Sequence, residues 1–552
     1  MAKYIFGIDL GTTYSCIAYV DEHARTVVAD NYEGENTTPS VVFFESPTNV
    51  IVGQVAKESA VLNPQNTVSL VKSKMGKTDF AIRYNGEDKT PEEVSAYILR
   101  KLAKDAGESL GTEVKDVVIT CPAYFGDAER KATRSAGEIA GLNVLEIISE
   151  PTAAALHYGC EKEQEEKTVL VYDLGGGTFD VTVMRIYADG RIEEICHDGW
   201  HELGGKNWDD EIMKYLAAQF REITGFKGNF NEADEMALRL QAEKIKKSLS
   251  KRSEYPATVQ VGELMGRINI SRETFDNLTR HLLNQSLEKT DAAIAVAEKR
   301  GYRVDEILLV GGSTRMPQVS RALAEKYGIE PKPAVNPDEA VARGAAIYAL
   351  GVYEIKADEV RKKLNSGEID LDKEADREEI EKYKEDAVVD TIMLPGLHGH
   401  KMSEVVTVTT TKSYALEVIM SNEDVKCRNM IFKNVRMEDG SVSVTKQYGT
   451  HVDNQQTAEL IVYESDFDTE YYEIDEDFKL GTASLELPGN LPAHSPLEVT
   501  FTLNREGILE VTGRDMTSNR EIHVTMQTSS GSTMSEEEIK TVMEKSRRIT
   551  VE

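Results

Sequence analysis

Cysteine is scarce in this sequence, and the few cysteines are far apart. Only five occur in 552 residues, and no two of them form a Cys-x-x-Cys pair. This pattern excludes a dense disulfide framework and a cysteine-rich zinc site, and it is typical of reduced thiols in a cytoplasmic protein. We expect each thiol to be a small core or surface residue. The five are Cys16, Cys121, Cys160, Cys196 and Cys427.

Long apolar runs are absent as well. No run approaches the roughly 20 residues that a membrane-spanning helix needs. The N-terminus has one basic residue, Lys3, followed by a short apolar stretch that reaches Asp9. A signal peptide would need a longer apolar region and small residues at a cleavage site. We therefore expect a cytoplasmic protein without a membrane partner.

Basic residues are also few relative to acidic residues. The chain has 64 Lys+Arg against 95 Asp+Glu, and its net charge is −31 at pH 7. Such an excess argues against nucleic acids as partners, because nucleic acids are polyanions. The length is enough for roughly three to five domains or subdomains of about 100–200 residues each.

The chain up to about residue 353 alternates short apolar runs with amphipathic helical patterns, which indicates an α/β fold. Residues 117–119, 169–172 and 307–310 are predicted to be buried strands. Thr90 and Glu93 form a capping-box pattern around a proline, and apolar residues then follow at helical spacing. This pattern predicts a helix that begins near residue 91.

The composition changes beyond residue 353. Between residues 361 and 386, 17 of 26 residues are charged, which predicts a solvated helix, a linker or both. From about residue 405 apolar and polar residues alternate, and a turn pattern at 504–507 predicts a β-hairpin. The predicted divisions are an α/β domain at 1–353, a charged connector at 354–404, an antiparallel β domain at 405–530 and the start of a helical segment at 531–552.

Two distant segments of the α/β region resemble each other. Residues 6–13 read Phe-Gly-Ile-Asp-Leu-Gly-Thr-Thr, and residues 171–178 read Val-Tyr-Asp-Leu-Gly-Gly-Gly-Thr. In both, apolar strand residues lead to an aspartate, Asp9 or Asp173, and then to glycine and threonine. We interpret this as a duplicated α/β unit in which one loop from each half faces a shared cleft.

The two loops have the composition of a phosphate-binding site. Glycines let backbone N–H groups approach phosphate oxygens, and threonine hydroxyls add donors. Each loop is followed by a predicted strand, and neither contains the Gly-Lys-Ser/Thr of a Walker loop. Either loop alone could be an ordinary glycine-rich turn. The pair, each with an aspartate whose oxygens suit Mg²⁺, favours a nucleotide with a divalent cation.

Two further segments fit such a site. A third glycine loop at 310–315 could lie against the α-phosphate or the sugar. Glu150 directly precedes a proline-initiated helix, so it is expected to be extended at the start of that helix. A carboxylate in that place can bind a metal-bound water or orient an attacking water.

These motifs, in this order and spacing, resemble those of the 70-kDa heat-shock chaperones, the DnaK-type family of the actin-like ATPase superfamily. The resemblance rests on residues 8–15, 173–180 and 309–315. It is dense from residue 4 to about 350 and weaker from about 405 to 531. It implies a two-lobed, actin-like ATPase domain followed by a β-sandwich peptide-binding domain and a short helix.

The resemblance also implies roles for individual residues. Lys72 matches the catalytic lysine, which would stabilise charge on the γ-phosphate, although on the residues alone it would be read as a surface lysine. The other implied catalytic residues are Asp9, Glu150, Asp173 and Thr178. The implied metal residues, for Mg²⁺ and also K⁺, are Asp9, Asp173 and Asp180. The implied phosphate loops are Gly11, Thr12, Thr13 and Tyr14, with Gly175, Gly176, Gly177 and Thr178 opposite.

The family's adenosine contacts map to a helix that, unaided, would be read as a solvated charged face. Its residues Glu243, Lys246 and Lys247 fall on one face at i, i+3 and i+4. Lys247 stands where many relatives have arginine, so stacking on adenine would be weaker. The remaining implied contacts are Ser250, Gly311, Gly312, Ser313, Arg315 and Asp338.

The sequence departs from the family pattern at three places. Lys206 and Asn207 replace two acids of a Gly-Gly-Glu-Asp motif, which could alter cleft closure or the response to exchange factors. The nearest equivalent of the leucine-rich interdomain linker, residues 386–396, has fewer leucines. The lid is present only as its first part, which should speed peptide exchange. The implied peptide pocket comprises Met420, Tyr448, Ala458 and Leu460.

The leading hypothesis is therefore an ATP-dependent chaperone whose ATP binding and hydrolysis switch its affinity for extended apolar peptide segments. The resemblance implies a J-domain cochaperone and a nucleotide exchange factor as partners. The alternative is a nucleotide-dependent module for a specialised partner, with weak or uncoupled ATPase activity, which the altered linker favours. A sugar-kinase relative is disfavoured because such proteins lack the β domain.

Overall fold

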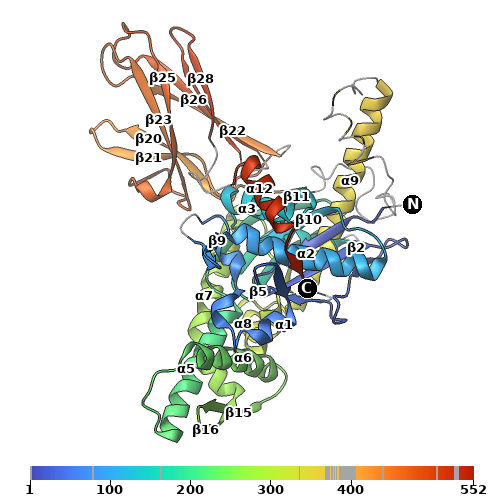
Figure 1. The fold of residues 1–552 in the computed structure, drawn as a ribbon. Coiled ribbons are helices and arrows are strands. Elements are labelled where there is room, and N and C mark those ends of the chain that lie inside the picture. Colours follow the sequence, from blue (N-terminus) through green and yellow to red (C-terminus); the bar gives the residue numbers. More distant parts are fainter. Residues whose placement is uncertain are drawn as a thin grey trace.

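The protein folds into two α/β lobes and a separate β-sandwich (Figure 1). We call residues 3–161 lobe I and residues 165–334 lobe II. None of the described helices is long and apolar enough to cross a membrane. The expected linker at 386–396 lies outside the described residues. The computed structural model describes residues 3–77, 80–161, 165–334, 336–366, 373, 377, 380, 382–383, 406–437, 440–504, 508–526 and 534–552.

Lobe I is built on a sheet with the strand order β11-β10-β1-β2-β3, with β4 also paired to β2. The predicted capped helix is present as α2, where the Thr90 hydroxyl accepts a hydrogen bond from the Glu93 N–H. The strands are β1 (Phe6–Asp9), β2 (Tyr14–Val20), β3 (Thr26–Val28), β4 (Thr38–Pro39), β10 (Asp116–Cys121) and β11 (Asn143–Ser149), and the helices are α2 (Pro91–Leu110), α3 (Asp127–Ile139) and α4 (Glu150–Glu161).

A smaller sheet in lobe I has the strand order β29-β6-β5-β7, and its strand β29 comes from the far end of the chain. The short helix η2 follows β7 and carries Lys72. The small-sheet region comprises β5 (Val41–Ser46), β6 (Asn49–Val52), β7 (Thr67–Ser69), β29 (Thr550–Val551), the β8–β9 hairpin (Ile82–Tyr84 and Glu87–Lys89), α1 (Gln54–Ser59), η1 (Pro64–Asn66) and η2 (Val71–Lys74).

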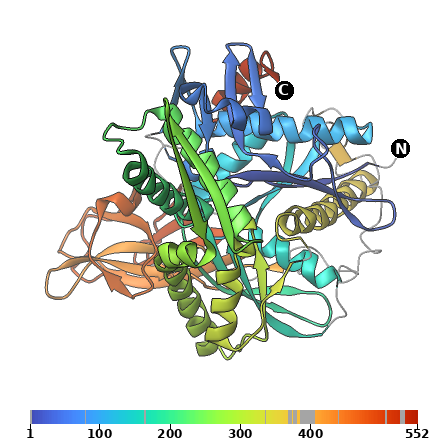
Figure 2. The same ribbon diagram turned by 90° about the horizontal axis from the view of Figure 1, so that it is seen from below.

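Lobe II contains a second large sheet with the order β18-β17-β12-β13-β14-β19. Figure 2 shows the helices of this lobe gathered on one side of the molecule. The elements are β12 (Lys167–Leu174), β13 (Phe179–Ile186), β14 (Ile192–Trp200), β15 (Glu254–Val261), β16 (Leu264–Ser271), β17 (Glu306–Val310), β18 (Lys332–Pro333), α5 (Gly205–Thr224), α6 (Glu232–Leu249), α7 (Arg272–Lys299), α8 (Pro317–Tyr327) and η3 (Gly312–Arg315). The sheet is completed by β19 (Val406–Thr407), which lies outside residues 165–334.

The two large sheets share one plan. β1 pairs antiparallel with β2 and parallel with β10, and β12 pairs antiparallel with β13 and parallel with β17. The outer strands also correspond, because β3 and β14 are antiparallel additions and β11 and β18 are parallel ones. Asp9 and Asp173 therefore occupy equivalent positions at the ends of β1 and β12. The sequence echo around these aspartates coincides with equivalent strand-to-strand turns.

Helices α4 and α9 (Ala340–Ser366) pack on each other at the junction of the two lobes. The contact is close because α9 has glycine and alanine where it meets α4 and β1. A Cβ added at Gly7 of β1 would lie 2.1 Å from the backbone nitrogen of Ala346 in α9. Small residues therefore let this helix approach the sheet closely.

The β-sandwich consists of two antiparallel sheets ordered β24-β21-β20-β23-β25 and β22-β26-β27-β28. The expected hairpin is formed by β26 and β27, with Leu503 opposite Leu509, and the alternating apolar residues of β26 face the core. The strands are β20 (Ser413–Ile419), β21 (Val425–Ile431), β22 (Ser441–Gly449), β23 (Thr457–Ser465), β24 (Tyr471–Tyr472), β25 (Lys479–Glu486), β26 (Pro496–Asn504), β27 (Leu509–Asp515) and β28 (Glu521–Met526), and η5 spans Glu476–Phe478.

The β-sandwich is docked on lobe II. The two-residue strand β19, which precedes the sandwich, pairs parallel with β14 at Ile192 and Glu193. The Thr409 hydroxyl donates to the Glu194 carboxylate at 2.6 Å, and Asn434 accepts a hydrogen bond from the backbone N–H of His197 at 3.0 Å. These polar contacts fix the position of the sandwich against the edge of the lobe II sheet.

Substitution of Gly344 tests the α4–α9 contact. A Cβ at this position would lie 1.7 Å from the carbonyl oxygen of Ala153, a backbone atom that cannot rotate away. We expect Gly344→Ala to lower the free energy of unfolding by about 2–3 kcal/mol. Gly159→Ala in α4 is the control, because its Cβ would meet only Ile186, at 3.9 Å. Urea unfolding in which both variants match the wild type would contradict this prediction.

Candidate active site

A cavity of about 720 Å³ lies between the two lobes. The turn between β1 and β2 enters it from lobe I, and the turn between β12 and β13 enters it from lobe II. Helix α6 and the loop after β17 contribute the remaining wall. The equivalent strand ends of the two sheets therefore face one shared space, as the sequence echo predicts.

The two glycine loops touch each other at the base of this cavity. A Cβ added at Gly176 would lie 2.1 Å from the Thr13 hydroxyl oxygen, and one at Gly177 would lie 2.5 Å from a methyl of Thr12. The contact between the loops therefore requires glycine at these two positions. Because one loop belongs to each lobe and the loops are in contact, a ligand held by both would join lobe I to lobe II.

Buried carboxylates accumulate beside the loops. Burial, and then the nearby Glu150 carboxylate, raises the pKa of Asp9 to about 7. The same two causes raise the pKa values of Asp173 and Asp180 well above their ordinary range. Among the described residues, Asp180 Oδ1 has no hydrogen-bond partner. The cluster therefore carries more negative potential than its own side chains neutralise.

One lysine is buried among these acids. Lys72 Nζ is paired with Glu150 Oε1, and both side chains are almost inaccessible to solvent. Burial opposes ionisation of this lysine, but the Glu150 and Asp9 carboxylates raise the pKa of Lys72 above its usual value. Lys72 is therefore a fixed positive charge that points into the cavity from η2.

The donor set suits a hard divalent cation held partly by other oxygens. Within the described part of the chain, no three acidic, histidine or cysteine side chains are arranged to hold a metal ion by themselves. Mg²⁺ is commonly bound by one or two carboxylates together with waters and phosphate oxygens. The excess carboxylates and the unpaired Asp180 oxygen fit that mode, so Asp9, Asp173 and Asp180 are the candidate metal residues.

The lobe II wall is held by its own hydrogen bonds. Lys246 Nζ pairs with Asp209 Oδ2 at 2.8 Å and donates to the Gly205 carbonyl oxygen at 2.9 Å. The Ser313 hydroxyl donates to the Gly175 carbonyl oxygen at 2.9 Å. The Lys246 bonds connect α6 to the start of α5, and the Ser313 bond connects the loop at 310–315 to the glycine loop at 175–178.

A clamp of polar contacts closes the cavity at its outer edge. Lys57 of α1 pairs with Glu243 of α6 at 2.5 Å, and Lys247 pairs with the same carboxylate at 2.8 Å. The Tyr14 hydroxyl donates to Glu243 at 3.0 Å, and both ammonium groups lie within 5 Å of the Tyr14 ring centroid. We call these four residues the cross-cleft clamp, because Tyr14 and Lys57 belong to lobe I and the other two belong to lobe II.

The structure gathers nearly all of the sequence-predicted nucleotide residues around one cavity. Gly177 and Asp180 do not line it; Gly177 packs on Thr12, and Asp180 is buried behind the wall, opposite Asp173 in the β12–β13 pairing. The residues that line it are Asp9, Gly11, Thr12, Thr13, Tyr14, Lys72, Glu150, Asp173, Gly175, Gly176, Thr178, Glu243, Lys246, Lys247, Ser250, Gly311, Gly312, Ser313, Arg315 and Asp338.

The residues predicted for a peptide pocket lie in the β-sandwich. Ala458 and Leu460 on β23 are buried in its core, and Tyr448 on β22 packs against them. Met420 is separate, in the turn between β20 and β21, where its backbone N–H donates to the Asp424 carbonyl oxygen. The structure thus brings together three of the four residues.

Sequence reasoning missed several polar residues of the cavity, among them Lys57 and Asp209. Lys57 lies on α1, whose short sequence has no feature that distinguishes it from a surface helix. Asp209 lies directly after the segment in which Lys206 and Asn207 replace two acids, but nothing in that segment indicates the ion pair of Asp209 with Lys246. Both act only through partners that are distant in the sequence, so no local pattern could have identified them.

Acid should weaken the cross-cleft clamp through Glu243. Burial raises the pKa of the Glu243 carboxyl, but the ammonium groups of Lys57 and Lys247 outweigh burial and lower this pKa to about 2. A carboxyl whose pKa is lower in the folded than in the unfolded chain stabilises the folded state at any pH above the unfolded-chain pKa. That stabilisation is lost as the pH falls toward the folded-state pKa. We expect up to about 3 kcal/mol to disappear between about pH 4.5 and pH 2.

The check is thermal unfolding as a function of pH in wild type and in Glu243→Gln. The variant should begin with lower stability and lose less on acidification. Glu235→Gln, an exposed carboxylate on the same helix, is the control and should keep the wild-type pH profile. An unchanged profile in Glu243→Gln would show that the clamp contributes nothing to stability.

Comparison with known proteins agrees with this geometry. The model of the Hsp70 protein family matches residues 5–361. The chaperone protein DnaK of Thermosipho africanus is 35% identical over 558 residues, which span 99% of this chain and 83% of that protein. The chaperone protein DnaK of Thermotoga neapolitana is 37% identical, over 99% of this chain and 84% of that protein. Given the paired glycine loops and these matches, the chain belongs to the Hsp70 family.

Proposed function

We propose that this chain is an ATP-dependent molecular chaperone that binds extended apolar segments of unfolded proteins. Residues 1–353 would form the two-lobed, actin-like ATPase domain, and residues 405–530 would hold the peptide. The observation that carries the proposal is the cavity between the lobes, where two equivalent glycine loops and one buried lysine converge on a cluster of unneutralised carboxylates. That arrangement suits a phosphate chain accompanied by a cation.

Each part of the cavity would have a distinct role. The backbone N–H groups of the loops at 11–14 and 175–178 would bind the phosphates from both lobes. Glu243, Lys246, Lys247 and Ser250, with the loop at 311–315 and Asp338, would hold the adenosine. Mg²⁺, held by phosphate oxygens and by Asp9, Asp173 and Asp180, would neutralise phosphate charge when bound. K⁺ would be a second cation in the same acidic region.

Hydrolysis would depend on the buried Lys72–Glu150 pair. Lys72 is fixed by its partner, so its ammonium group can stabilise negative charge that develops on the γ-phosphate oxygens at little reorganisation cost. Glu150 would hold the attacking water by accepting a hydrogen bond from it, and the Thr178 hydroxyl would orient that water from the opposite loop. Turnover should be slow, because the site offers positioning and charge but no strongly basic group.

A short chain of contacts leads from this site toward the β-sandwich. Tyr124 of lobe I hydrogen-bonds Thr178. The centroid of the Tyr124 ring lies 3.8 Å from the centroid of the His201 ring in lobe II. The positive charge of Lys412 on the sandwich side helps to lower the pKa of His201, after burial, to about 4. A change in the position of Thr178 would therefore alter the contacts of Tyr124 and His201 near the place where the sandwich docks.

The peptide-binding domain would use Met420, Tyr448, Ala458 and Leu460. An extended peptide between the turn after β20 and the sandwich core would meet apolar side chains on alternate residues. A J-domain cochaperone and a nucleotide exchange factor are the proposed helpers, and the cytoplasm is the proposed location. Lys206 and Asn207, in place of two acids, would change how the exchange factor opens the cleft.

Steady-state ATPase measurements with and without an extended apolar peptide test the function. Peptide-stimulated turnover is the expected result, because peptide and nucleotide affinities must be reciprocally linked in a coupled chaperone. Slow turnover that ignores the peptide would instead support a specialised, uncoupled binding module. Transfer of phosphate to a small molecule would contradict both.

Lys72→Ala tests the catalytic assignment. The variant should bind ATP nearly as tightly as wild type, because the loops and the adenosine wall are unchanged. Its single-turnover hydrolysis should fall by at least about 100-fold, the usual cost of losing a fixed group that stabilises transition-state charge. Lys74→Ala, on the same short helix, is the matched control and should hydrolyse at the wild-type rate. A wild-type rate in Lys72→Ala would refute the assignment.

A further inference from the structure

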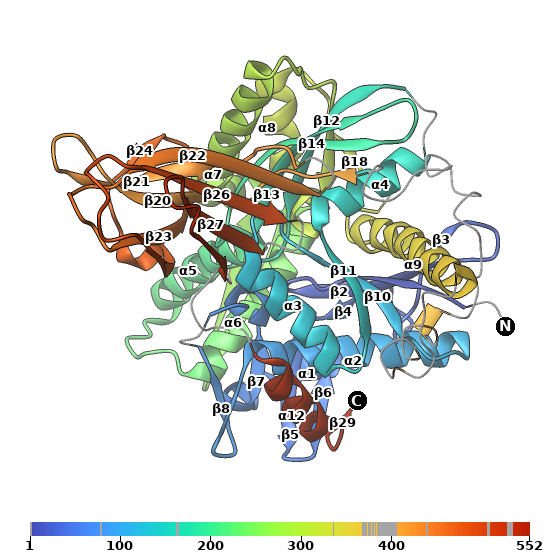
Figure 3. The same ribbon diagram turned by 90° about the horizontal axis from the view of Figure 1, so that it is seen from above.

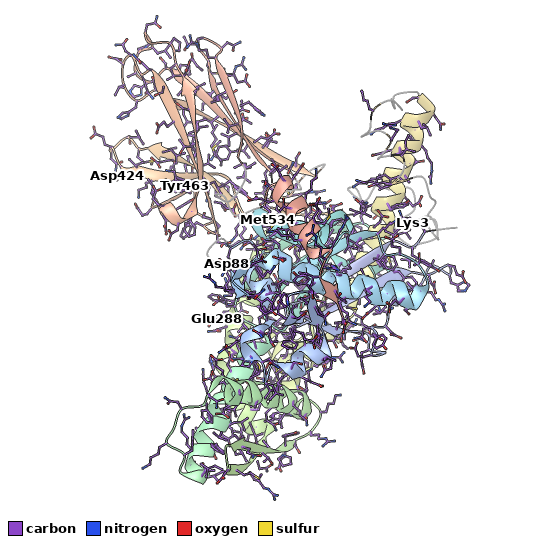
Figure 4. The ribbon with its side chains drawn as sticks, viewed as in Figure 1. Lys3, Asp88, Glu288, Asp424, Tyr463 and Met534 are labelled. Atoms are coloured by element: carbon purple, nitrogen blue, oxygen red, sulfur yellow. The ribbon has the colours of Figure 1, made fainter. Side chains whose placement is uncertain are left out.

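Residues 535–552 leave the β-sandwich and bind lobe I (Figures 1 and 3). Ser535 caps helix α12 (Glu536–Ser546), which lies against α3, and the chain then forms β29. Figure 4 places Met534, just before this helix, between the sandwich and lobe I. The segment that the sequence predicts as the start of a lid is therefore a connection between two domains.

The last residues add a strand to the small sheet of lobe I. β29 runs parallel to β6, with Thr550 opposite Asn49 and Val551 opposite Val50. Three backbone hydrogen bonds hold it: Thr550 N–H to Thr48 O at 2.8 Å, Glu552 N–H to Val50 O at 3.0 Å and Val52 N–H to Glu552 O at 2.8 Å. Without β29, β6 would be an edge strand with unpaired amides and carbonyls.

A side-chain pocket accompanies this edge. Val551 is only 5% exposed and belongs to the same buried cluster as Phe44, Val50 and Val52 of the small sheet. Its neighbour Thr550 is exposed, as expected for adjacent residues of a strand. The edge thus offers both main-chain hydrogen bonds and a specific apolar site, which are the two requirements of strand addition.

Two basic residues of α2 recognise the backbone of the arriving segment. The Arg100 guanidinium donates to the carbonyl oxygens of Ser546 at 2.7 Å and Ile549 at 3.0 Å, and Lys104 Nζ donates to that of Val551 at 3.2 Å. These are carbonyls at the end of α12 and beyond it, which the helix itself cannot satisfy. Ser546 is fully buried at this contact.

The acceptor edge is connected to the candidate active site. β6 pairs with β5, and β5 pairs with β7, which leads directly into η2 and Lys72. β19 holds the start of the sandwich on lobe II, and β29 holds its far end on lobe I. The sandwich is therefore attached to both sides of the cavity by strand additions.

We propose that the β6 edge of lobe I, with the Val551 pocket and Arg100, is a strand-acceptor site whose ligand is residues 546–552 of this chain. Occupation of the site tethers the β-sandwich to lobe I. Release of the segment would leave an open edge able to accept another extended segment with an apolar residue at the position of Val551. This inference does not depend on ATP hydrolysis.

Hydrogen exchange in two full-chain variants tests the proposal. Val551→Asp places a charge in the apolar pocket, so the amide of Val52 should exchange at least tenfold faster than in wild type. Thr550→Asp puts the same charge on the exposed side of the same strand and should leave that exchange unchanged. Unaltered exchange in the amides of β12 and β13 would show that lobe II remains folded in both variants.

A peptide supplied in trans separates binding from general destabilisation. A synthetic peptide of residues 543–552, added to the Val551→Asp protein, should restore slow exchange at Val52, whereas the same peptide carrying Val551→Asp should not. Arg100→Gln should weaken protection of both β6 and α12. Equal Val52 exchange in wild type and Val551→Asp, or failure of the native peptide to restore protection, would overturn the proposal.

Discussion

The ion pair between Lys72 and Glu150 is the contact on which the rest of the site depends. It is the one ammonium–carboxylate pair described inside a cluster that also holds Asp9, Asp173 and Asp180. A single lysine cannot neutralise four acids in a low-dielectric interior, so the cluster favours proton uptake or a cation. Burial and then the Glu150 carboxylate raise the pKa of Asp9 accordingly. A chain with a net charge of −31 can therefore attract a polyanion only through backbone amides, a few fixed lysines and a bound metal ion.

The duplicated sheet plan explains why these groups meet. Because β1 and β12 are equivalent, their terminal loops approach from opposite lobes and touch through glycine. The same plan places α4 and α9 together at the junction, where Gly344 permits backbone contact. The two lobes are therefore joined at a tightly packed helix pair. The cross-cleft clamp of Tyr14, Lys57, Glu243 and Lys247 connects the two lobes at the outer edge of the cavity.

Much of the fold and of the cavity could be predicted from the sequence, because the signals were local. Strands, the capped helix at 91, the helical segment within 531–552 and the two Asp-Leu-Gly loops depend on residues that are neighbours in the chain. Lys57 could not be predicted, since its role arises from Glu243 across the cleft. The destination of residues 535–552 was equally hidden: a capping box shows where a helix begins, but Arg100 and the Val551 pocket decide where it docks. The peptide-binding residues remain a prediction.

The shortness of β19 and β29 limits how far the lobes can move while both strands stay paired. Each strand has only two residues, and each follows the edge of a different lobe. One residue of strand rises about 3.3 Å, so a relative displacement of roughly that size would shift one pairing out of register. A slip by one residue would turn Val551 away from its pocket and Thr550 into it. Displacements of the lobes smaller than one residue of strand would therefore keep the sandwich paired with both lobes. Larger displacements would break the pairing of either β19 or β29.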